Sequence, residues 1–282
     1  MNKTQDLDFF IECKDFTVSG KKFQLLHDDQ LEMLITTPKP NDSDLGMYYQ
    51  SEDYISHTDS KRSLFEKLYH IVKTYSLNKK ITLITKLNRN TGELLDIGAG
   101  TGDFLALAQK KGWRTKGIEP NDHAKKLAKQ KGVDLESESN KFDSEQFDII
   151  TMWHVLEHIS GLENQIKELN RLLKPGGHIV VAVPNFKSYD AQYYKSFWAA
   201  YDVPRHLWHF SKKAIRILFE NEGLYLEKTL PMRFDSFYVS LLSEKYKTGK
   251  MNFFKAFWIG LRSNIKGRQT QEFSSHIYIL KK

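Results

Sequence analysis

The chain has 282 residues, of which 40% are hydrophobic and 13% aromatic, so it can build a sizeable core and is not globally disordered. Its single cysteine, Cys13, excludes a disulfide framework and a cysteine-built zinc site, and it fits a reducing compartment. No apolar run approaches the ~20 residues of a membrane span, and the polar start lacks the apolar run of a signal peptide. We therefore expect a soluble cytoplasmic protein.

The net charge of +7 is unevenly distributed. From residue 226 to the end there are eleven Lys/Arg and four Asp/Glu, so this segment carries the whole excess. This distribution argues against a general nucleic-acid coat and favours one locally basic surface.

The first part of the chain gives weak signals. Apolar residues between 9 and 23 suggest short strands, and 37–42 reads as a loop. After a helix cap at Asp59 or Ser60, helical spacing predicts one helix to about residue 72 and a second over 77–87. The aromatic and imidazole side chains before this cap could form a lid over a ligand or pack together, and both readings stay open for Tyr48, Tyr49, Tyr54 and His57.

From residue 93 strands and helices alternate regularly. The predicted strands are 93–97, 115–119, 133–135, 147–152, 178–183, 224–230 and 276–280, and the predicted helices are 102–111, 122–131, 162–173 and 211–222. This alternation predicts an α/β fold with a Rossmann-like, doubly wound, mostly parallel seven-stranded sheet. It is preceded by a helical N-terminal extension and interrupted by a long aromatic loop over 186–210 and an insert before the last strand.

Three glycines follow the first of these strands at alternate positions, Gly98, Gly100 and Gly102. A strand that turns tightly into a helix presents free backbone N–H groups, and glycine allows a ligand to come close. The dinucleotide fingerprint would place its third glycine at position 103, where this chain has Asp103. Asp96, before the turn, suits a ligand with a cationic or hydrogen-donating part.

The stretch LLDIGAGTGDF resembles the first motif of class I S-adenosylmethionine (AdoMet)-dependent methyltransferases. The resemblance implies AdoMet as cofactor and S-adenosylhomocysteine as its product, bound by Asp96, Gly98, Ala99, Gly100 and Gly102. Glu119 ends the second strand, where a carboxylate can accept hydrogen bonds from both ribose hydroxyls, and Pro120 lies beside it.

The run FDIITMWHVLEHI resembles the fourth-strand motif of the same family. It implies that Met152, Trp153 and His154 line the methionyl part of the cofactor, whereas Glu157 and His158 hold the turn. His154 and His158 have the spacing of a metal pair on a helix, but no third ligand is evident nearby, so we expect no metal. The run LKPGGHIVVAVPN resembles the fifth-strand motif, which is structural.

The segment PRHLWHF follows the fifth strand, at the edge where open α/β sheets bind ligands. His206 and His209 are therefore candidates for orienting an acceptor or taking its proton, since histidine titrates near neutrality. A packing or capping role remains open for each, and His206 is the stronger candidate. Similar Pro-Arg-His-Leu segments recur in this methyltransferase group.

The basic insert over 231–275 has a helical pattern over 252–268 with an apolar face and flanking basic residues such as Lys255, Arg262 and Lys266. Three roles fit: a cap over the acceptor site, peripheral contact with a membrane, or a dimer contact. The cap is favoured. Nucleic-acid binding by stacking has weak support.

Together these features predict transfer of a methyl group from AdoMet to a small-molecule acceptor, of quinone, lipid or glycosyl type, by an enzyme similar to the bacterial ubiquinone-biosynthesis methyltransferases. A non-catalytic AdoMet-binding scaffold and an NAD-dependent oxidoreductase are the alternatives. We divide the chain into an extension over 1–75 and a methyltransferase domain over 76–282. The extension resembles segments that carry two Cys-x-x-Cys pairs elsewhere, but the pairs are missing here. We expect a monomer or homodimer.

Overall fold

The computed structural model describes residues 7–41, 44, 46–49 and 64–282. Tyr54, His57 and the predicted cap at Asp59 or Ser60 lie outside the described residues, as does the side chain of Tyr49. In the described part of the chain, no helix combines the length and the apolar character needed to cross a bilayer.

The central sheet has six strands in the order β5-β4-β6-β7-β10-β9. Strands β5, β4, β6 and β7 are parallel, and β10 runs antiparallel to both of its neighbours. The bounds are β4 (Glu93–Ile97), β5 (Arg114–Ile118), β6 (Phe147–Trp153), β7 (Leu173–Pro184), β9 (Tyr225–Pro231) and β10 (Ser275–Lys281). The α/β fold and the mostly parallel sheet are confirmed.

The prediction of a seven-stranded sheet is wrong. Residues 133–135 do not form a strand, and this segment meets β5 only through an isolated parallel bridge between Ile118 and Glu136. Glu136 exchanges backbone hydrogen bonds with Gly117 and Glu119, both of 2.9 Å. The chain then leaves the sheet for a short 3-10 helix, Ser139–Lys141, so the pairing ends before a strand can form.

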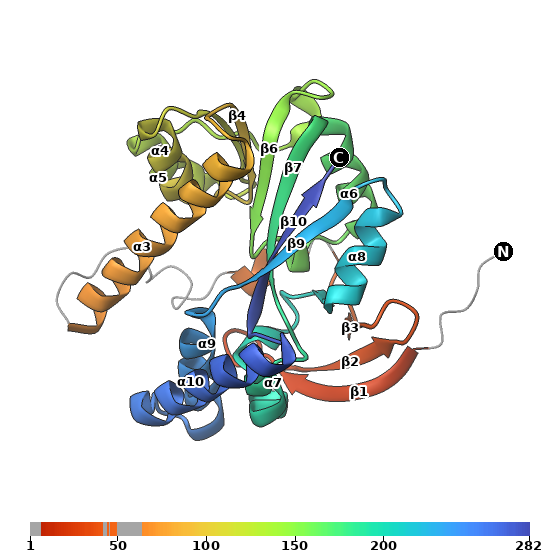
Figure 1. Ribbon diagram of the computed structural model, residues 1–282. Helices are drawn as coiled ribbons and strands as arrows, with labels where there is room; N and C mark the ends of the chain where they lie inside the picture. The colour runs from red at the N-terminus through yellow and green to blue at the C-terminus, as the bar shows by residue number, and fades with distance from the viewer. Residues whose placement is uncertain (1–6, 42–43, 45, 50–63) are drawn as a thin grey trace.

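Helices cover both faces of the sheet (Figure 1). Successive residues of a buried strand point to opposite faces, and the core divides accordingly. Leu94, Ile149 and Val180 belong to a cluster with α4 (Asp103–Lys110) and α5 (Asp122–Gln130). Leu95, Ile150 and Val181 belong to a cluster with α6 (Leu162–Leu172) and α8 (Lys212–Glu220). The alternating sequence pattern therefore gives two cores, one on each face.

A single helix, α3 (Leu64–Leu87), replaces the two helices predicted before the sheet. Residues 73–76 separate the two predicted helices but contain neither glycine nor proline, so nothing in the backbone interrupts the helix. The proposed domain boundary after residue 75 lies within this helix. Lys73 on α3 forms an ion pair of 2.7 Å with Asp103, which also pairs with Lys131, so Asp103 ties α3 and the end of α5 to α4.

The N-terminal extension begins with strands, as the apolar residues between 9 and 23 suggest, and these strands form a sheet before the predicted helical part. Strands β1 (Leu7–Lys14), β2 (Lys22–Asp28) and β3 (Met33–Thr37) form an antiparallel sheet that ends on β8 (Trp208–His209). Strand β8 comes from the PRHLWHF segment and pairs with β3 through Leu34 and Ile35. Local sequence patterns do not reveal the pairing of β3 with β8, because the two strands lie about 170 residues apart in the chain.

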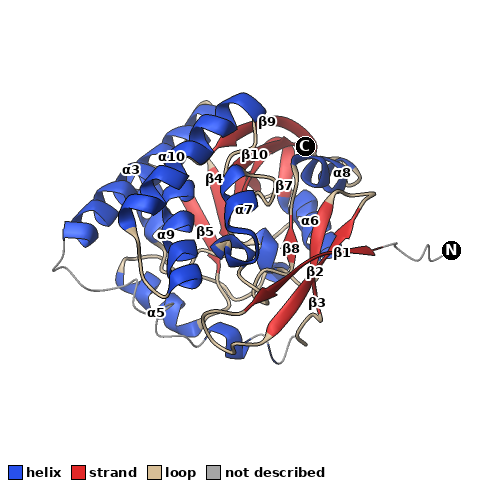
Figure 2. Ribbon diagram, turned by 90° about the horizontal axis from the view of Figure 1, so that it is seen from below, coloured by secondary structure: helices blue, strands red, loops and turns tan. Residues whose placement is uncertain are grey.

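The carboxyl ends of the parallel strands face the N-terminal sheet and three further helices (Figures 1 and 2). The helices are α7 (Tyr189–Tyr194), which lies within the predicted aromatic loop, and the hairpin of α9 (Asp235–Thr248) and α10 (Phe253–Thr270). Asp190 of α7 joins these parts, because its buried carboxylate accepts hydrogen bonds from Trp198, Ser263 and Ser274. The chemistry predicted from sequence lies at this covered edge.

The packing of α3 predicts that shortening a side chain changes the stability of the protein at the buried end of the helix but not at its exposed end. Ile84 is fully buried against the sheet, whereas Ile71 on the same helix is 66% exposed. We expect Ile84→Ala to lower the free energy of unfolding by about 2–5 kcal/mol, because it leaves a cavity in the core. Ile71→Ala is the matched control and should change it by no more than about 0.5 kcal/mol. Urea denaturation measures both, and equal losses would contradict the packing of α3.

Candidate active site

The glycine turn after β4 adopts a left-handed conformation at each glycine, with φ of 69° at Gly98, 53° at Gly100 and 74° at Gly102. A Cβ atom on Gly98 would lie 2.3 Å from Val155, and one on Gly102 would lie 2.9 Å from Ala128. At Gly100 a Cβ atom would meet nothing within 4 Å. Two of the glycines therefore allow close packing of the protein, and the third leaves open space on the outside of the turn.

Glu119 lies directly against this turn. Its Oε2 accepts a 2.9 Å hydrogen bond from the Gly100 backbone N–H, and its Oε1 accepts one of 2.9 Å from Asn121. Ala99 is half-buried in the turn, and its N–H donates to Ile118, while Pro120 is exposed beside Glu119. Glu119 therefore lies against the glycine turn, and its role in binding a ribose stays a prediction.

Asp96 is buried at the end of β4. Burial raises the pKa of its carboxyl, and the hydrogen bond of 2.6 Å from Thr151 and the charge of Lys80 only partly oppose this effect. Lys80, on α3, places its ammonium 4.1 Å from the centre of the Trp153 ring, and burial lowers its pKa. The site therefore contains a carboxyl group and an amine in a poorly solvated environment, where burial disfavours the charge of each and their mutual attraction partly opposes this effect.

The three residues predicted to line the cofactor after β6 have different environments. Met152 is fully buried in the core, so its side chain contributes packing. Trp153 is half-buried beside Phe104, and its indole Nε1 is a buried donor that has no hydrogen-bond partner among the described residues. His154 is half-buried with φ of 58°.

His154 links the sheet to the insert. Its Nε2 lies 3.1 Å from Asp235 at the start of α9, and its Nδ1 lies 3.4 Å from Glu157. Burial disfavours the imidazolium, but the two carboxylates outweigh it and raise the pKa of His154 to about 10. His154 therefore carries a positive charge at neutral pH and fixes the first turn of α9 against the end of β6.

Glu157, His158 and His206 form a buried cluster. Glu157 and His158 belong to a short 3-10 helix (Leu156–His158) after β6, and the rings of His158 and His206 are 4.5 Å apart. The His158 Nδ1–H donates to the carbonyl of Arg205 at 3.0 Å, and the His206 Nδ1–H donates to that of Ala200 at 2.9 Å. Both tautomers are therefore fixed by the backbone, which leaves Nε2 of His206 as its basic atom.

These three side chains could also hold a cation. Each offers a ligand atom, all within 4.8 Å of one another, and the Glu157 carboxylate is buried without a hydrogen bond from the described residues. From the sequence, His154 and His158 are considered as a metal-binding pair without a third ligand. The tertiary structure instead joins His158 to Glu157 and His206, while His154 is bound to Asp235. The expectation of no metal remains a prediction.

His209 has a more structural environment than His206. It lies on β8, and its Nε2–H donates to the hydroxyl of Thr36 at 3.1 Å, because that hydroxyl donates in turn to the His206 carbonyl at 2.6 Å. Burial and the neighbouring His206 keep the pKa of His209 well below its usual value. The packing alternative considered for this residue therefore fits its surroundings best.

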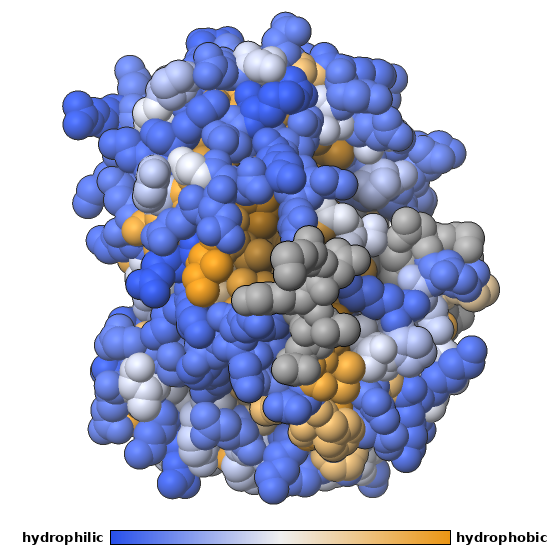
Figure 3. Space-filling view, turned by 90° about the vertical axis from the view of Figure 1, so that its right-hand side faces the viewer, coloured by the Kyte–Doolittle hydropathy of each residue, from blue (hydrophilic) through white to orange (hydrophobic). Residues whose placement is uncertain are grey.

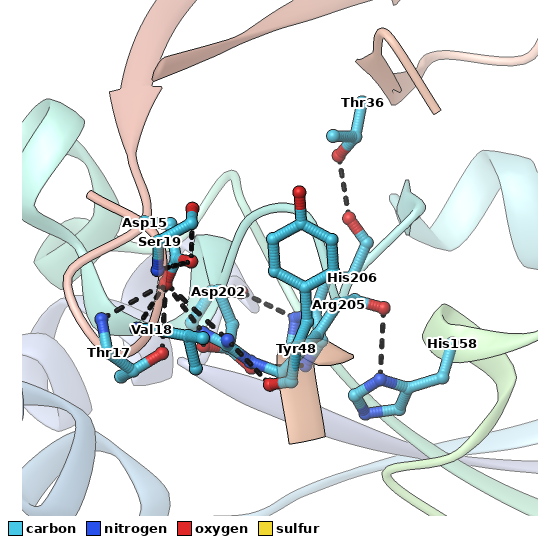
Figure 4. A network of polar contacts seen from close by, with 11 residues as sticks. Asp15, Thr17, Val18, Ser19, Thr36, Tyr48, His158, Asp202, Arg205 and His206 are labelled. Atoms are coloured by element: carbon cyan, nitrogen blue, oxygen red, sulfur yellow. Dashed lines mark hydrogen bonds and ion pairs between the residues drawn. The ribbon is translucent and has the colours of Figure 1, made fainter. Parts of the chain in front are cut away.

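A buried arginine holds the loop that carries His206 (Figure 4). Arg205 donates to both oxygens of Asp202, at 2.9 and 2.5 Å, and to the carbonyl of Tyr48 at 3.1 Å. Its guanidinium also lies 3.5 Å from Asp15, whose carboxylate caps the turn after β1 through Thr17 and Ser19. Asp15 and Arg205 thus connect the N-terminal sheet directly to His206.

Sequence reasoning missed Lys80, Asp235, Asp202 and Arg205 as parts of the site. One signal was present for Lys80, which interrupts the apolar face formed by Leu77, Ile81 and Ile84 on α3. For Asp235 there was none, because its partner His154 lies some 80 residues earlier and only the tertiary fold brings the two together.

The buried His158 predicts a pH-dependent stability. Burial and the adjacent His206 lower the pKa of His158 to about 4, whereas an unfolded histidine titrates near ~6.5. The unfolded chain then binds the proton more readily, so the stability from neutral His158 is present above pH ~6.5 and is lost as the pH falls toward 4.

We expect His158→Asn, whose amide can donate to the Arg205 carbonyl, to flatten the fall in unfolding free energy between pH 6.5 and 4 by up to ~1.4 kcal/mol per pH unit. Urea denaturation at a series of pH values measures this slope. His123→Asn on the exposed surface of α5 controls for the loss of an imidazole. An unchanged slope in His158→Asn would show that this residue does not set the acid response.

Comparison with known proteins agrees with this geometry. A family model described as a methyltransferase domain matches residues 64–229, which is more than half of the chain. The ubiquinone biosynthesis O-methyltransferase of Coxiella burnetii is 29% identical over 133 residues, covering 43% of this chain and 54% of that protein. The demethylmenaquinone methyltransferase of Staphylococcus epidermidis is 25% identical over 150 residues, covering 46% and 62%. The chain spans about half the length of the curated relatives it matches.

Solved structures share the fold. Geranyl diphosphate C-methyltransferase from Streptomyces coelicolor aligns with a TM-score of 0.53 at 15% identity, covering 79% of this chain and 86% of that one. A putative sarcosine dimethylglycine methyltransferase from Galdieria sulphuraria aligns with a TM-score of 0.51 at 16% identity, covering 75% and 85%. With the glycine turn, the acid beside it and the family match, the chain belongs to the class I S-adenosylmethionine-dependent methyltransferases.

Proposed function

We propose that this protein transfers a methyl group from AdoMet to a small-molecule acceptor. The observation that carries the proposal is the contact between Glu119 and the open glycine turn at Gly100, at the carboxyl edge of the parallel sheet. A carboxylate beside an open glycine turn suits a ribose whose hydroxyls can donate to it. The glycine at position 100 leaves the space that such a group needs.

Other residues of the site fit the cofactor as well. The indole N–H of Trp153 is a buried donor that lacks a partner, and Asp96 provides a carboxylate for a cationic group. We assign cofactor binding to Asp96, Gly98, Ala99, Gly100, Gly102, Glu119 and Pro120, with Trp153 and His154 next to the methionyl part and Met152 contributing through its backbone. The ammonium of Lys80 interacts with Asp96 and would compete with the cationic group of AdoMet for this carboxylate. AdoMet binding would therefore shift the Lys80 ammonium away from Asp96.

AdoMet supplies an electrophilic methyl group on a sulfonium. The contribution of the chain is to align the acceptor with that methyl group and to exclude water. The pair formed by His154 and Asp235 supports a capping role for the insert, because it fixes α9 at the end of β6. On the other side, Tyr75 of α3 contacts Phe234 just before α9, with ring centres 5.7 Å apart. We infer that α3 and the insert over 231–275 enclose the acceptor.

His206 is the proposed base for an acceptor that must lose a proton. Its Nδ1–H is held by the Ala200 carbonyl, so Nε2 would accept the proton. The Asp202 carboxylate lies 3.9 Å from this nitrogen, and a Glu157 carboxylate oxygen lies within 4.8 Å of a ring nitrogen of His206, so both acids would stabilise the imidazolium that forms. His209 is bound to Thr36 and has a weaker claim to the same task.

The acceptor class is proposed from chemistry. The two curated relatives named above act on quinone precursors by their names, and an aromatic, partly apolar acceptor suits a site bounded by Trp153, Tyr75 and Phe234. A lipid-linked or glycosyl precursor would fit the same surroundings. The proposal places the enzyme in the cytoplasm, as the reduced, buried Cys13 suggests, and as a monomer or homodimer without nucleic acid.

Mass spectrometry of small-molecule extracts tests this function. The purified protein is incubated with a methyl-labelled AdoMet and the extract, and a labelled product that is absent without protein supports the proposal. AdoMet binding without any labelled product would favour a non-catalytic scaffold. Binding of NAD in place of AdoMet in a parallel titration would overturn the assignment and favour an oxidoreductase.

The contact at Glu119 predicts a selective loss of cofactor affinity. Glu119→Ala should weaken AdoMet binding by ~1–3 kcal/mol, because it removes the acceptor for buried hydroxyl groups. Glu136→Ala is the control, since its carboxylate belongs to the neighbouring segment and pairs with Lys141 on the surface. Isothermal titration calorimetry measures both, and an unchanged affinity in Glu119→Ala would remove Glu119 from the site.

The proposed base predicts a second, separable effect. His206→Asn keeps a donor for the Ala200 carbonyl but offers no basic nitrogen, so we expect turnover to fall about 10²–10⁴-fold with AdoMet affinity nearly unchanged. His206→Ala should lose turnover to the same extent. If the Asn variant turns over like the natural protein while the Ala variant unfolds at a lower temperature, His206 packs the loop and is not the base.

A further inference from the structure

The predicted apolar face of α10 is turned outward. Its aromatic side chains are largely exposed, with exposed fractions of 85% for Phe254, 64% for Trp258, 53% for Phe257 and 52% for Phe253. Ile265, two turns further along, is 49% exposed. We call these five side chains the α10 patch. Large apolar side chains gathered on one surface mark an interaction site in a folded protein.

Small residues explain why the aromatic side chains are not buried. The inward face of α10 consists mainly of Ala256, Gly260, Ser263 and Gly267. A Cβ atom on Gly260 would lie 2.8 Å from the Phe237 ring and 3.0 Å from its backbone, and one on Gly267 would lie 2.8 Å from Phe273. The helix packs so closely against α9 and the segment before β10 that large side chains cannot fit on its inward face. The α10 patch therefore stays exposed in the folded state.

Every charged residue of the segment that carries the α10 patch is basic. Residues 250–270 contain five Lys/Arg and no Asp or Glu. Lys250, Lys266 and Arg268 are exposed, and none of them forms an ion pair with a described residue. A partner that covers this surface must therefore combine an apolar layer with negative charge, which is the chemistry of an anionic phospholipid interface.

A groove continues the α10 patch at the turn between α9 and α10. It has a volume of about 480 Å³ and is lined in part by Lys250, Met251, Asn252 and Phe254. Glu244 also lines it, and the buried carboxylate of this residue is 3.3 Å from the ammonium of Lys255, which offsets its charge. The groove offers room for a lipid headgroup next to the aromatic side chains.

We propose that α10 binds the surface of an anionic phospholipid bilayer, lying along it with the α10 patch in the interfacial layer. A second copy of the chain is the weaker occupant, because a two-fold contact through this face would bring two all-positive surfaces together. The face of the protein shown in Figure 3 is largely hydrophilic, with hydrophobic residues in separate areas. The inference stands independently of methyl transfer, but under the proposed function it would bring the covered edge of the sheet close to an apolar acceptor.

Vesicle sedimentation with the full chain tests this surface. We expect binding to vesicles of equimolar phosphatidylglycerol and phosphatidylcholine, little binding to phosphatidylcholine alone, and weaker binding at high salt. Phe254→Ser with Trp258→Ser should lower the partition coefficient at least about tenfold. Phe9→Ser, which removes a side chain that is 62% exposed on β1, is the matched control and should leave binding unchanged.

The basic residues are tested separately with neutral variants. Lys266→Gln with Arg268→Gln should lower the partition coefficient about tenfold or more, whereas Lys110→Gln with Lys111→Gln on the exposed end of α4 removes the same charge elsewhere and should not. A blue shift of tryptophan emission with anionic vesicles should disappear in Trp258→Phe, because the other tryptophans are less exposed.

Three results would overturn the proposal: absence of binding to anionic vesicles, equal binding of the natural chain and the Phe254/Trp258 variant, or a protein dimer that only the aromatic variant dissociates. The last result would make a second copy the occupant. AdoMet titration of the same variants keeps the two proposals apart. Vesicle binding without AdoMet binding would leave this inference standing and reject the proposed function, and the reverse result would do the opposite.

Discussion

A buried guanidinium constrains the covered edge of the sheet. Arg205 is only 5% exposed, and a charge in that position is tolerated only if carboxylates and carbonyl groups surround it. Asp202, Asp15 and the Tyr48 carbonyl supply those partners from three separate parts of the chain. The ion pairs hold the pKa of Asp202 below its usual value, although burial alone would raise it. These contacts join the N-terminal sheet and the loop at 202–206 through one buried group, which fixes their relative geometry.

This constraint determines where the buried imidazoles lie. The Arg205 carbonyl accepts from His158, and the next residue, His206, has its carbonyl bound by Thr36 of β3. Glu157 is attached to the same loop, because its carbonyl accepts from the Leu207 N–H. The N-terminal sheet therefore supports the loop that carries the proposed base, and β8 makes this sheet continuous with the rest of the protein. The proposed cofactor site depends on other elements, namely the glycine turn, Glu119 and the end of β6.

The two faces of the insert between β9 and β10 carry different residues and make different contacts. Asp235 at the start of α9 pairs with His154, and Asp190 binds Ser263 of α10, so the inner side is fixed by buried polar contacts. The outer side of α10 keeps its aromatic and basic residues in solvent. A helix with small residues inside and large apolar residues outside is the reverse of the usual arrangement in a globular protein. This packing agrees with the two proposals above, in which the outer face of α10 binds an external apolar layer and the inner side of the insert covers the site.

The sequence by itself determined the glycine turn, the strand before it and the acid that follows one strand later. Gly98, Gly100 and Gly102 all have positive φ, a backbone conformation that residues with a Cβ atom adopt only with strain. The positions of the glycines in the sequence therefore indicate where the backbone takes this conformation. Alternating apolar strands and amphipathic helices likewise predicted the layers, and the helix predicted over 211–222 corresponds to α8, which Ser211 caps.

Only the tertiary structure decided which distant groups meet. The central sheet has six strands because the segment after residue 133 pairs with β5 only at Glu136. The N-terminal strands β1, β2 and β3 gain a fourth strand, β8, from a segment about 170 residues later. His154 binds Asp235 while His158 joins Glu157 and His206, a choice that spacing along one helix could not make. For α10 the periodicity revealed an apolar face, but which face is covered depends on the close approach of Gly260 and Gly267 to their neighbours. Local patterns fix the backbone, whereas contacts between distant segments depend on the whole fold.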